Sequence, residues 1–319
     1  MAAQNGNNQA QDREELQSAL HRLGLPPTYP QVILYRQSQC PGKGLGLKAA
    51  RNIPRGTPIL AEAELFWIAG TPDPPPVQAS KPEFQALSCP VVPHTARARF
   101  AANNFEMGKS GRRMKRGIFV TASRFNHSCV PNAHFTWNAA SKLLTIHAIV
   151  DITQGQEIFL NYHPKDYLKP AIERQQELRT SYSFVCGCPA CQPNTDSKRA
   201  SEARRQWMAG LNSIIGLNQN THTQGQREQL LANIQFFGRQ LQEERLFYPQ
   251  LADVYGKEIS WYRREIQLVI NGAGRTRLLY KEEALKVATA KLDLDVVCSG
   301  HDSSEVRDTL RTIRELRQV

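Results

Sequence analysis

The stretch that decides the fold is Asn126-His127-Ser128-Cys129-Val130-Pro131-Asn132, and a second cysteine group further along the chain completes it. In that group Cys186, Cys188 and Cys191 are spaced as Cys-x-Cys-x-x-Cys, and Tyr182-Ser183-Phe184 leads into them. Asn-His-Ser-Cys alone would be a weak signal. Four thiols divided one and three, with an aromatic lead, form a far more specific combination.

The cysteine spacing predicts a structural zinc site. Cys186, Cys188 and Cys191 place three soft thiolates within one short turn, and tetrahedral zinc needs a fourth ligand from elsewhere in the fold. Cys129 is the natural candidate. Four protein ligands would leave no open position on the metal, so the site would not be catalytic. The competing interpretation is unligated buried thiols, which the glycine and proline between the cysteines disfavour because they suit a tight knuckle.

Length and composition bound the class of protein. The chain has 319 residues, 40% of them hydrophobic, which is enough to bury a core and to form two or three domains. No apolar run approaches the roughly 18 residues that cross a bilayer, and the start lacks the pattern of a signal peptide. Seven cysteines, an odd number, favour metal ligation over a disulfide framework. We expect a soluble monomer of the nucleus or cytoplasm, without a membrane partner.

The formal net charge of +11 would suit nucleic acid or chromatin as a partner. The charge is spread along the chain, however, with only short clusters such as the one from Arg112 to Arg116. The cysteine spacing also lacks the second CxxC or HxxxH pair of a zinc-containing DNA-binding protein. We therefore do not expect direct nucleic-acid binding, and a zinc-containing DNA-binding protein ranks last among the functional hypotheses.

The chain divides into a mostly β part and a helical part. Residues 1–29 predict a disordered Gln- and Asn-rich start (1–11) and a short helix from Asp12. Residues 30–170 predict a mostly β domain with a short helical insert at about 80–105, and residues 171–195 hold the zinc motif. Short apolar runs between turn residues indicate the strands, at 31–35, 58–61, 117–120, 134–137, 143–148 and 157–162.

Residues 199–319 predict a separate all-α domain. Apolar residues recur there at helical spacing, at 227–244, 249–270, 280–294 and 303–316. Antiparallel helix pairs of this length are compatible with a TPR-like array, although no clean repeat signature is present. The predicted fold class is α+β, with a mostly β domain and zinc knuckle followed by this C-terminal helical domain.

The order of the motifs carries a family resemblance over roughly residues 30–192. The motifs are, in order, Gly42-Lys43-Gly44-Leu45-Gly46-Leu47, Asn103-Asn104-Phe105, Ser123-x-x-Asn126-His127-Ser128-Cys129-x-Pro131-Asn132, Gly155-Gln156-Glu157-Ile158-x-x-x-Tyr162 and Tyr182-x-Phe184-x-Cys186-x-Cys188-x-x-Cys191. Together they resemble the SET domain with its post-SET zinc motif, and most closely the SET and MYND (SMYD-type) branch. The chain departs from that branch because no Cys- and His-rich MYND finger interrupts the segment between Leu65 and Asn103.

The resemblance implies methyl transfer from S-adenosylmethionine to the ε-amine of a lysine in a histone or another protein. Cofactor and lysine would enter from opposite faces and meet through a narrow channel, so geometry would carry most of the catalysis. The amine must first lose its proton, whose ordinary pKa is about 10.4. A dry aromatic channel beside the sulfonium would lower that pKa by desolvation and like-charge repulsion.

The resemblance also implies roles for particular residues. Tyr162 would be catalytic, beside the transferring methyl, although its position also suits a strand-end core aromatic. Ser123 and Tyr182 would bind the substrate lysine. Asn103 would hold the methionine part of the cofactor, with Asn104 as its rival. The predicted cofactor-binding residues are Lys43, Gly44, Leu45, Asn103, Asn126, His127, Tyr162 and Phe184.

Two alternatives stay open. His127 could act as a general base instead of a cofactor contact, although a histidine within such a motif loop better suits the second role. The whole chain could also be a catalytically silent SET scaffold that binds a partner through its helical domain. Cofactor binding would discriminate the scaffold from the enzyme.

Overall fold

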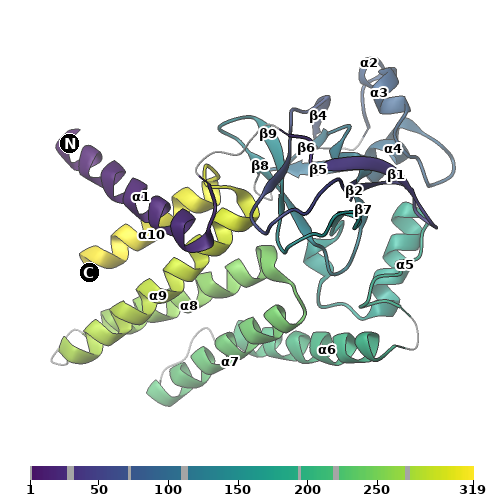
Figure 1. Ribbon diagram of the computed structural model, residues 1–319. Helices are drawn as coiled ribbons and strands as arrows, with labels where there is room; N and C mark the ends of the chain where they lie inside the picture. Colours follow the sequence, from purple (N-terminus) through teal and green to yellow (C-terminus); the bar gives the residue numbers. More distant parts are fainter. Residues whose placement is uncertain are drawn as a thin grey trace. The chain divides into compact units, whose positions relative to one another are not determined.

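The computed structural model describes residues 2–26, 32–70, 73–108, 114–192, 195–217, 223–269 and 274–319. The chain forms two compact units, and Figure 1 labels most of their helices and strands. One unit comprises residues Gln31–Glu202 and holds all the strands of the described ranges; we call it the β unit. The other comprises Met1–Pro30 together with Ala203–Val319 and is the helical unit.

The β unit contains small sheets rather than one large sheet. Three of them are antiparallel, and their strands in pairing order are β1 (Tyr35–Cys40) and β2 (Gly44–Ala49); β3 (Pro58–Glu62), β9 (Leu143–Ala148) and β8 (Ala133–Asn138); and β4 (Phe66–Ala69), β6 (Lys115–Ile118) and β5 (Asn104–Met107). Strand periodicity explains the central strand β9. Leu144 and Ile146 are fully buried in the core, whereas Leu143 before them and Thr145 between them are partly exposed.

A short parallel pair brings two distant segments together. β7 (Asn126–His127) pairs with β10 (Phe159–Leu160), so the Asn-His-Ser-Cys motif lies beside the segment that ends in Tyr162. The Asn132 side chain holds the same two segments together. Its Nδ2 donates to Glu157 O at 2.9 Å, and its Oδ1 accepts from Phe159 N at 2.7 Å.

Short helices cover the sheet β4-β6-β5. They are α2 (Pro76–Ala79), α3 (Pro82–Gln85) and α4 (Ala96–Asn103). The Phe66 ring of β4 lies 5.3 Å from Phe84 of α3 and 6.0 Å from Phe100 of α4, measured between ring centroids. All three rings are buried in one apolar cluster, which positions the end of α4 and the start of β5. These helices fall in or next to the predicted insert at about 80–105.

Near its C-terminal end the β unit contains a helix, α5, that sequence periodicity did not predict. The 3₁₀ turns η1 (Ala122–Arg124) and η2 (Pro164–Asp166) precede it, and α5 runs over Ala171–Tyr182. Ser183 then adopts a left-handed conformation (φ 55°), and its N–H donates to Arg179 O at 3.0 Å. This is a common way to end a helix, and it turns the chain sharply between Tyr182 and Phe184.

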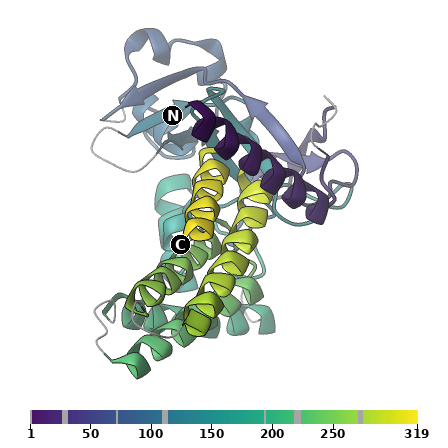
Figure 2. The same ribbon diagram turned by 90° about the vertical axis from the view of Figure 1, so that its left-hand side faces the viewer.

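The helical unit unites the two ends of the chain. Its helices are α1 (Ala2–Leu23), α6 (Asp196–Leu217, which begins in the β unit), α7 (Gln224–Glu243), α8 (Ala252–Leu268), α9 (Gly274–Ser299) and α10 (Ser304–Gln318), with a π-helical turn η4 (Phe247–Leu251). α8 packs on α9 and α9 on α10. Figure 2 shows α1 beside α9 and α10, and the three helices are in contact. Among the described residues, no helix has the length and apolar character to cross a membrane.

The structure corrects the predicted N-terminal segment. Helix α1 begins at Ala2 rather than at Asp12, so the prediction of disorder is wrong for residues 2–11. Ion pairs join α1 to the far end of the sequence: Asp12 pairs with Arg314, and Arg22 Nη2 lies 2.6 Å from Asp293 Oδ1. Such long-range partners stabilise a helix that its Gln- and Asn-rich composition does not indicate.

Several strand predictions also need correction. The strand expected at 31–35 is β1, which only starts at Tyr35, and Gln31 lies outside the described residues. The strand expected at 157–162 shortens to β10. Strands β2, β4 and β5 were not predicted, and helix α6 lies largely within the predicted all-α region 199–319, although its bounds were not predicted. The polar strand β1 forms because it pairs with β2 across a tight turn, a partnership that apolar alternation does not reveal.

Candidate active site and zinc knuckle

The four predicted cysteines lie together in the β unit. The Sγ atoms of Cys129, Cys186, Cys188 and Cys191 are all within 4.8 Å of one another, and those of Cys129 and Cys191 are 3.5 Å apart. Zn–S bonds of about 2.3 Å in a tetrahedron put sulfurs roughly 3.8 Å apart. The pKa of Cys188 is well below the ordinary thiol value because the Cys129 thiol, and then the other two, donate to its sulfur. This donor set fits a structural zinc ion.

Helix α5 holds the knuckle through Gln175. Its side-chain Nε2 donates to Cys186 O at 2.7 Å, and its Oε1 accepts from Cys186 N at 2.8 Å. Both polar groups of the Cys186 backbone are therefore fixed by one amide. Sequence reasoning missed Gln175 because α5 itself was not predicted.

Arg174 is the second α5 residue at the knuckle. The side chain is 5% exposed and donates through Nη2 to Ala190 O at 3.0 Å and to Cys191 Sγ at 3.6 Å. Burial lowers its pKa, but the sulfurs of Cys129 and Cys191 outweigh burial and raise the pKa overall. Glu202 Oε1 lies 3.7 Å from Nη2 on the other side. Arg174 thus supplies a buried positive charge beside four potential thiolates, a role the sequence did not indicate.

His127 links the knuckle to Tyr162. Its Nε2 lies 3.3 Å from Cys129 Sγ, and its Nδ1 accepts the backbone N–H of Tyr162 at 3.1 Å. Burial lowers the pKa of His127 to about 3, so the ring is neutral and carries its proton on Nε2. Both nitrogens are engaged inside the protein, which argues against His127 as a general base.

Tyr162 lines a first cavity of about 420 Å³. The cavity brings together every predicted cofactor-binding residue, from the β1–β2 turn, the end of α4, β7, the segment after β10 and the segment after α5. These lining residues are Lys43, Gly44, Leu45, Asn103, Asn126, His127, Tyr162 and Phe184.

Glu157 organises one wall of the first cavity. Its Oε1 accepts from Asn126 Nδ2 at 2.7 Å, and its Oε2 lies 2.9 Å from Lys43 Nζ. Asn126 Nδ2 also donates to Leu45 O at 3.3 Å. Because both amide hydrogens are used in this way, Asn126 Oδ1 is the atom left to accept from a ligand. The Asn126 side chain therefore suits a ligand group that donates, such as an ammonium.

Gly46 allows these groups to approach. A Cβ at this position would lie 2.5 Å from Asn126 Nδ2 and 2.8 Å from both Glu157 Oε1 and Cys40 Sγ, closer than real contacts permit. Gly42 and Gly44 instead supply positive φ angles of 72° and 74° in the turn between β1 and β2. The glycine-rich motif is thus a hairpin that needs glycine for two reasons: close packing of side chains at Gly46, and positive φ angles at Gly42 and Gly44.

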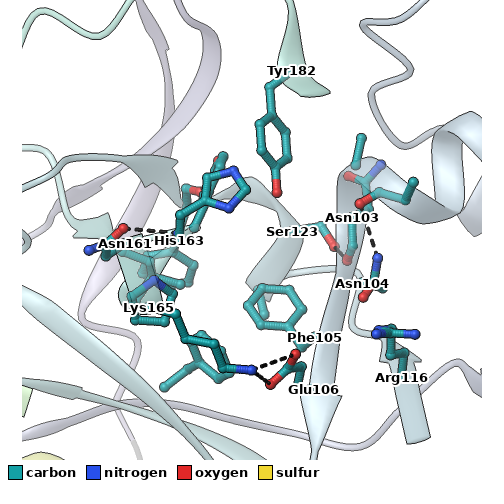
Figure 3. Close-up of a pocket in the computed structure, with 18 of the residues that line it drawn as sticks. Asn103, Asn104, Phe105, Glu106, Arg116, Ser123, Asn161, His163, Lys165 and Tyr182 are labelled. Atoms are coloured by element: carbon teal, nitrogen blue, oxygen red, sulfur yellow. Dashed lines mark hydrogen bonds and ion pairs between the residues drawn. The ribbon is translucent and has the colours of Figure 1, made fainter. Parts of the chain in front are cut away.

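Tyr162 also lines a second cavity, of about 320 Å³, and Figure 3 shows many of the side chains around it. Its lining residues include Asn104, Phe105, Glu106, Arg116, Asn161, His163 and Lys165. The two cavities share Ala102, Asn103, Ser123, Tyr162 and Tyr182. They therefore meet at the predicted catalytic and substrate-binding residues, with the ring centroids of Tyr162 and Tyr182 4.8 Å apart.

The adjacent residues Asn103 and Asn104 have different surroundings in the structure. Asn103 lines both cavities and is only 5% exposed, with Nδ2 donating to Ser88 O and Arg99 O, each at 2.7 Å. Asn104 lines only the second cavity. The geometry therefore favours Asn103 over its neighbour at the first cavity. Ser123 Oγ supports this segment by donating to Phe119 O at 2.7 Å and to Asn103 O at 3.1 Å.

The tyrosines at the junction are neutral. Burial raises the pKa of Tyr162 well above its ordinary value, and burial raises the pKa of Tyr182 to about 12. The Tyr162 hydroxyl donates to Phe125 O at 2.7 Å, so its oxygen lone pairs remain for a group at the junction. A neutral phenol positioned in this way can orient a reactant but does not take its proton.

Two cavities that meet at a pair of tyrosines, beside a cluster of four cysteines, match the arrangement that the motif order implies. A family model described as "SET domain" matches residues 44–163. The chain contains a SET domain. The predicted fold class, a mostly β SET domain followed by a helical region, is confirmed. The match includes Tyr162 and Asn126 but ends before Tyr182 and the three knuckle cysteines.

Two known lysine methyltransferases resemble parts of the chain. The histone-lysine N-methyltransferase set5 of Schizosaccharomyces pombe is 31% identical over 183 residues, which is 55% of this chain and 56% of that protein. The human protein-lysine N-methyltransferase SMYD4 is 42% identical over 97 residues, 30% of this chain and 11% of that protein. The chain thus spans about half the length of the first relative and about a tenth of the second.

A solved structure described as the SET domain of LSMT bound to lysine and AdoHcy is also similar. It shares 14% identity, covers 96% of this chain and 92% of that chain, and has a TM-score of 0.34. A TM-score this low does not show that the two chains share a fold. The SET assignment of this chain therefore rests on the family match and the two sequence relatives.

Proposed function

We propose that the chain transfers a methyl group from S-adenosylmethionine to the ε-amine of a lysine in a protein substrate. The observation that carries the proposal is the meeting of two cavities at Tyr162, which lies in the SET-domain match, and Tyr182, which follows that match in the chain. The names of the two relatives, a histone-lysine and a protein-lysine methyltransferase, support it. The substrate class is thus a protein lysine, in a histone or in another protein.

The first cavity suits the cofactor, which would supply an electrophilic methyl group. Asn126 Oδ1 would accept from its ammonium because the two amide hydrogens are held by Glu157 and Leu45. Phe184 also lines this cavity and would offer its ring to the adenine of the cofactor. The centroid of the Phe184 ring lies 6.4 Å from that of Tyr162. The backbone of the β1–β2 turn, free of large side chains at Gly44, would allow close approach.

The second cavity suits the lysine side chain. The aromatic walls at Tyr162 and Tyr182 offer little solvation to an ammonium, so desolvation lowers its pKa from about 10.4 and favours loss of the proton to solvent. The free amine would then be the nucleophile for the electrophilic methyl group that the cofactor would supply. Tyr162, neutral because burial raises its pKa, orients the amine through its oxygen rather than acting as a base.

Zinc would act at a distance from the reaction. Cys129, Cys186, Cys188 and Cys191 would hold the ion, and their sulfurs fit its tetrahedral geometry. The knuckle follows Phe184 directly in the chain, and Cys129 contacts the imidazole that holds the Tyr162 backbone. Metal binding would therefore stabilise both cavities at their junction without touching a reactant.

The test separates binding from transfer. The intact chain is incubated with labelled S-adenosylmethionine and a protein extract, and labelled lysines are identified by mass spectrometry. Tyr162→Phe should reduce single-turnover transfer by about 10²–10³-fold, whereas calorimetry should find cofactor affinity unchanged. Tyr280→Phe, in the helical unit, is the matched control. Unchanged transfer in Tyr162→Phe would make Tyr162 a core residue, and absent cofactor binding in the wild type would favour the silent scaffold.

A further inference from the structure

One charged side chain of the second cavity has no ion-pair partner among the described residues. Its charged lining residues are Glu106, Arg116, Lys165 and Asp166. Lys165 Nζ lies 3.3 Å from Glu106 Oε2, and Asp166 Oδ1 lies 2.9 Å from Nζ of Lys169. Arg116 makes no ion pair or side-chain hydrogen bond with any residue in the described part of the chain. Lys169 also pairs with Glu177, so among the described residues Arg116 is the charged group of this wall that has no ion-pair partner.

The strand register makes the missing pair informative. Glu106 of β5 is the direct antiparallel partner of Arg116 of β6, and opposite charges at such positions normally pair across the strands. Here the Glu106 carboxylate is engaged by Lys165 from η2 instead. Figure 3 shows Arg116 at the cavity beside Asn104, on the opposite side from His163. The Arg116 guanidinium is thus available to bind a ligand, because it does not form an ion pair with Glu106 on the neighbouring strand.

His163 does not alter this balance. The pKa of His163 is lowered mainly by burial, so the ring is neutral near pH 7. The wider charge distribution acts in the same direction, because most of the net +11 belongs to residues 31–202, the β unit. A positively charged surface attracts and orients acidic partners. The second cavity therefore favours a substrate segment that brings a negative charge beside the lysine.

We propose that Arg116 selects the substrate by binding the carboxylate of an Asp or Glu within two residues of the target lysine. Guanidinium and carboxylate match as planar, two-point partners. In an extended peptide, side chains two residues apart lie on the same face, roughly 7 Å apart. One cavity that contains both Arg116 and the tyrosine pair can thus receive the lysine and its acidic neighbour together. This inference rests on the proposed methyl transfer.

The test uses a pool of peptides, each with one lysine and with random residues at the two positions on either side. The intact chain and S-adenosylmethionine are added, and methylated peptides are sequenced by mass spectrometry. Wild type should enrich Asp and Glu at one or more of these positions, with kcat/KM about tenfold above the matched Gln peptide. Arg116→Ala should abolish the enrichment, and Arg116→Glu should shift it toward Lys and Arg.

Two controls keep the outcomes separate. Arg51→Glu changes an exposed arginine of the same unit outside both cavities and should keep the wild-type preference. Calorimetry with S-adenosylmethionine checks that each Arg116 variant is folded and binds the cofactor. Methylation without acidic preference, or a preference that survives Arg116→Glu, overturns the inference alone. A pool with no methylated lysine, despite cofactor binding, overturns the proposed function and this inference with it.

Discussion

Arg174→Met should loosen the zinc knuckle more than any change on the exposed face of α5. The guanidinium is 5% exposed and donates to Ala190 O at 3.0 Å and to Cys191 Sγ at 3.6 Å. Methionine keeps an unbranched side chain of similar length but removes the charge and every donor. The substitution thus leaves a buried carbonyl and a buried anionic sulfur without their partner.

The size of the effect follows from the geometry. A zinc ion with four thiolates carries a net charge of −2. At 3.6 Å, with an effective dielectric constant of about 20, one unit charge pair is worth about 4–5 kcal/mol. The cost of burying the guanidinium offsets part of this, and removal of one partner from a buried pair typically costs about 3–5 kcal/mol. We therefore expect a loss of about 3 kcal/mol, which is roughly a hundredfold in zinc affinity.

The assay is zinc release from the intact chain to a colorimetric chelator, at increasing urea concentrations. Arg174→Met should release zinc at clearly lower urea than wild type, and Arg174→Lys should fall between them because it keeps the charge. Arg179→Met, on the exposed face of the same helix, is the control and should change stability by no more than about 0.5 kcal/mol. If Arg174→Met and Arg179→Met retain zinc equally, the charge argument is refuted.

Three further outcomes are expected. Phe184→Ala should weaken S-adenosylmethionine binding about tenfold in calorimetry, because a base stacked on an aromatic ring is worth roughly 1–3 kcal/mol; wild-type affinity would contradict the assigned cavity. Glu157→Gln keeps its shape but loses the ion pair with Lys43 at 2.9 Å, so cofactor affinity should fall about threefold and depend less on salt. Single-turnover transfer should rise from pH 7 to pH 10 without a later fall, because burial raises the pKa of Tyr162 above its ordinary value and the phenol keeps its proton; a fall above pH 9 would show that it ionises.

The sequence could predict those parts of the site whose chemistry dictates residue type. Zinc demands thiolates at short spacing, so Cys129 and the three knuckle cysteines are readable as ligands, and the structure places their sulfurs together. Motif order likewise identifies Tyr162 and Asn126, which both line the first cavity. These residues are recognisable because few other side chains could replace them.

The residues that support the site were beyond sequence reasoning. Helix α5 buries Ala171, Arg174 and Leu178, so one position of its inner face is an arginine and the apolar period is broken. Arg174 can stabilise the knuckle only because the folded chain places the knuckle against helix α5. Arg116 is a similar case, since its lack of an ion-pair partner among the described residues depends on the β5–β6 register and on Lys165 from a distant turn. Hydrophobic periodicity predicts single helices and strands, but it does not predict contacts between elements that are distant in the sequence.

The contacts of helix α1 restrict the order in which the two units can fold while the chain is being synthesised. It packs on α9 and α10, yet the whole β unit lies between these helices in the sequence. Roughly 250 residues separate Leu23 from Gly274, so at about 5–20 residues per second the ribosome needs about 10–50 s to supply the partners of α1. The SET domain can fold during that interval, while the first helix must wait with its apolar face uncovered. A nascent-chain chaperone would therefore meet this protein at its first helix, long before the last one emerges.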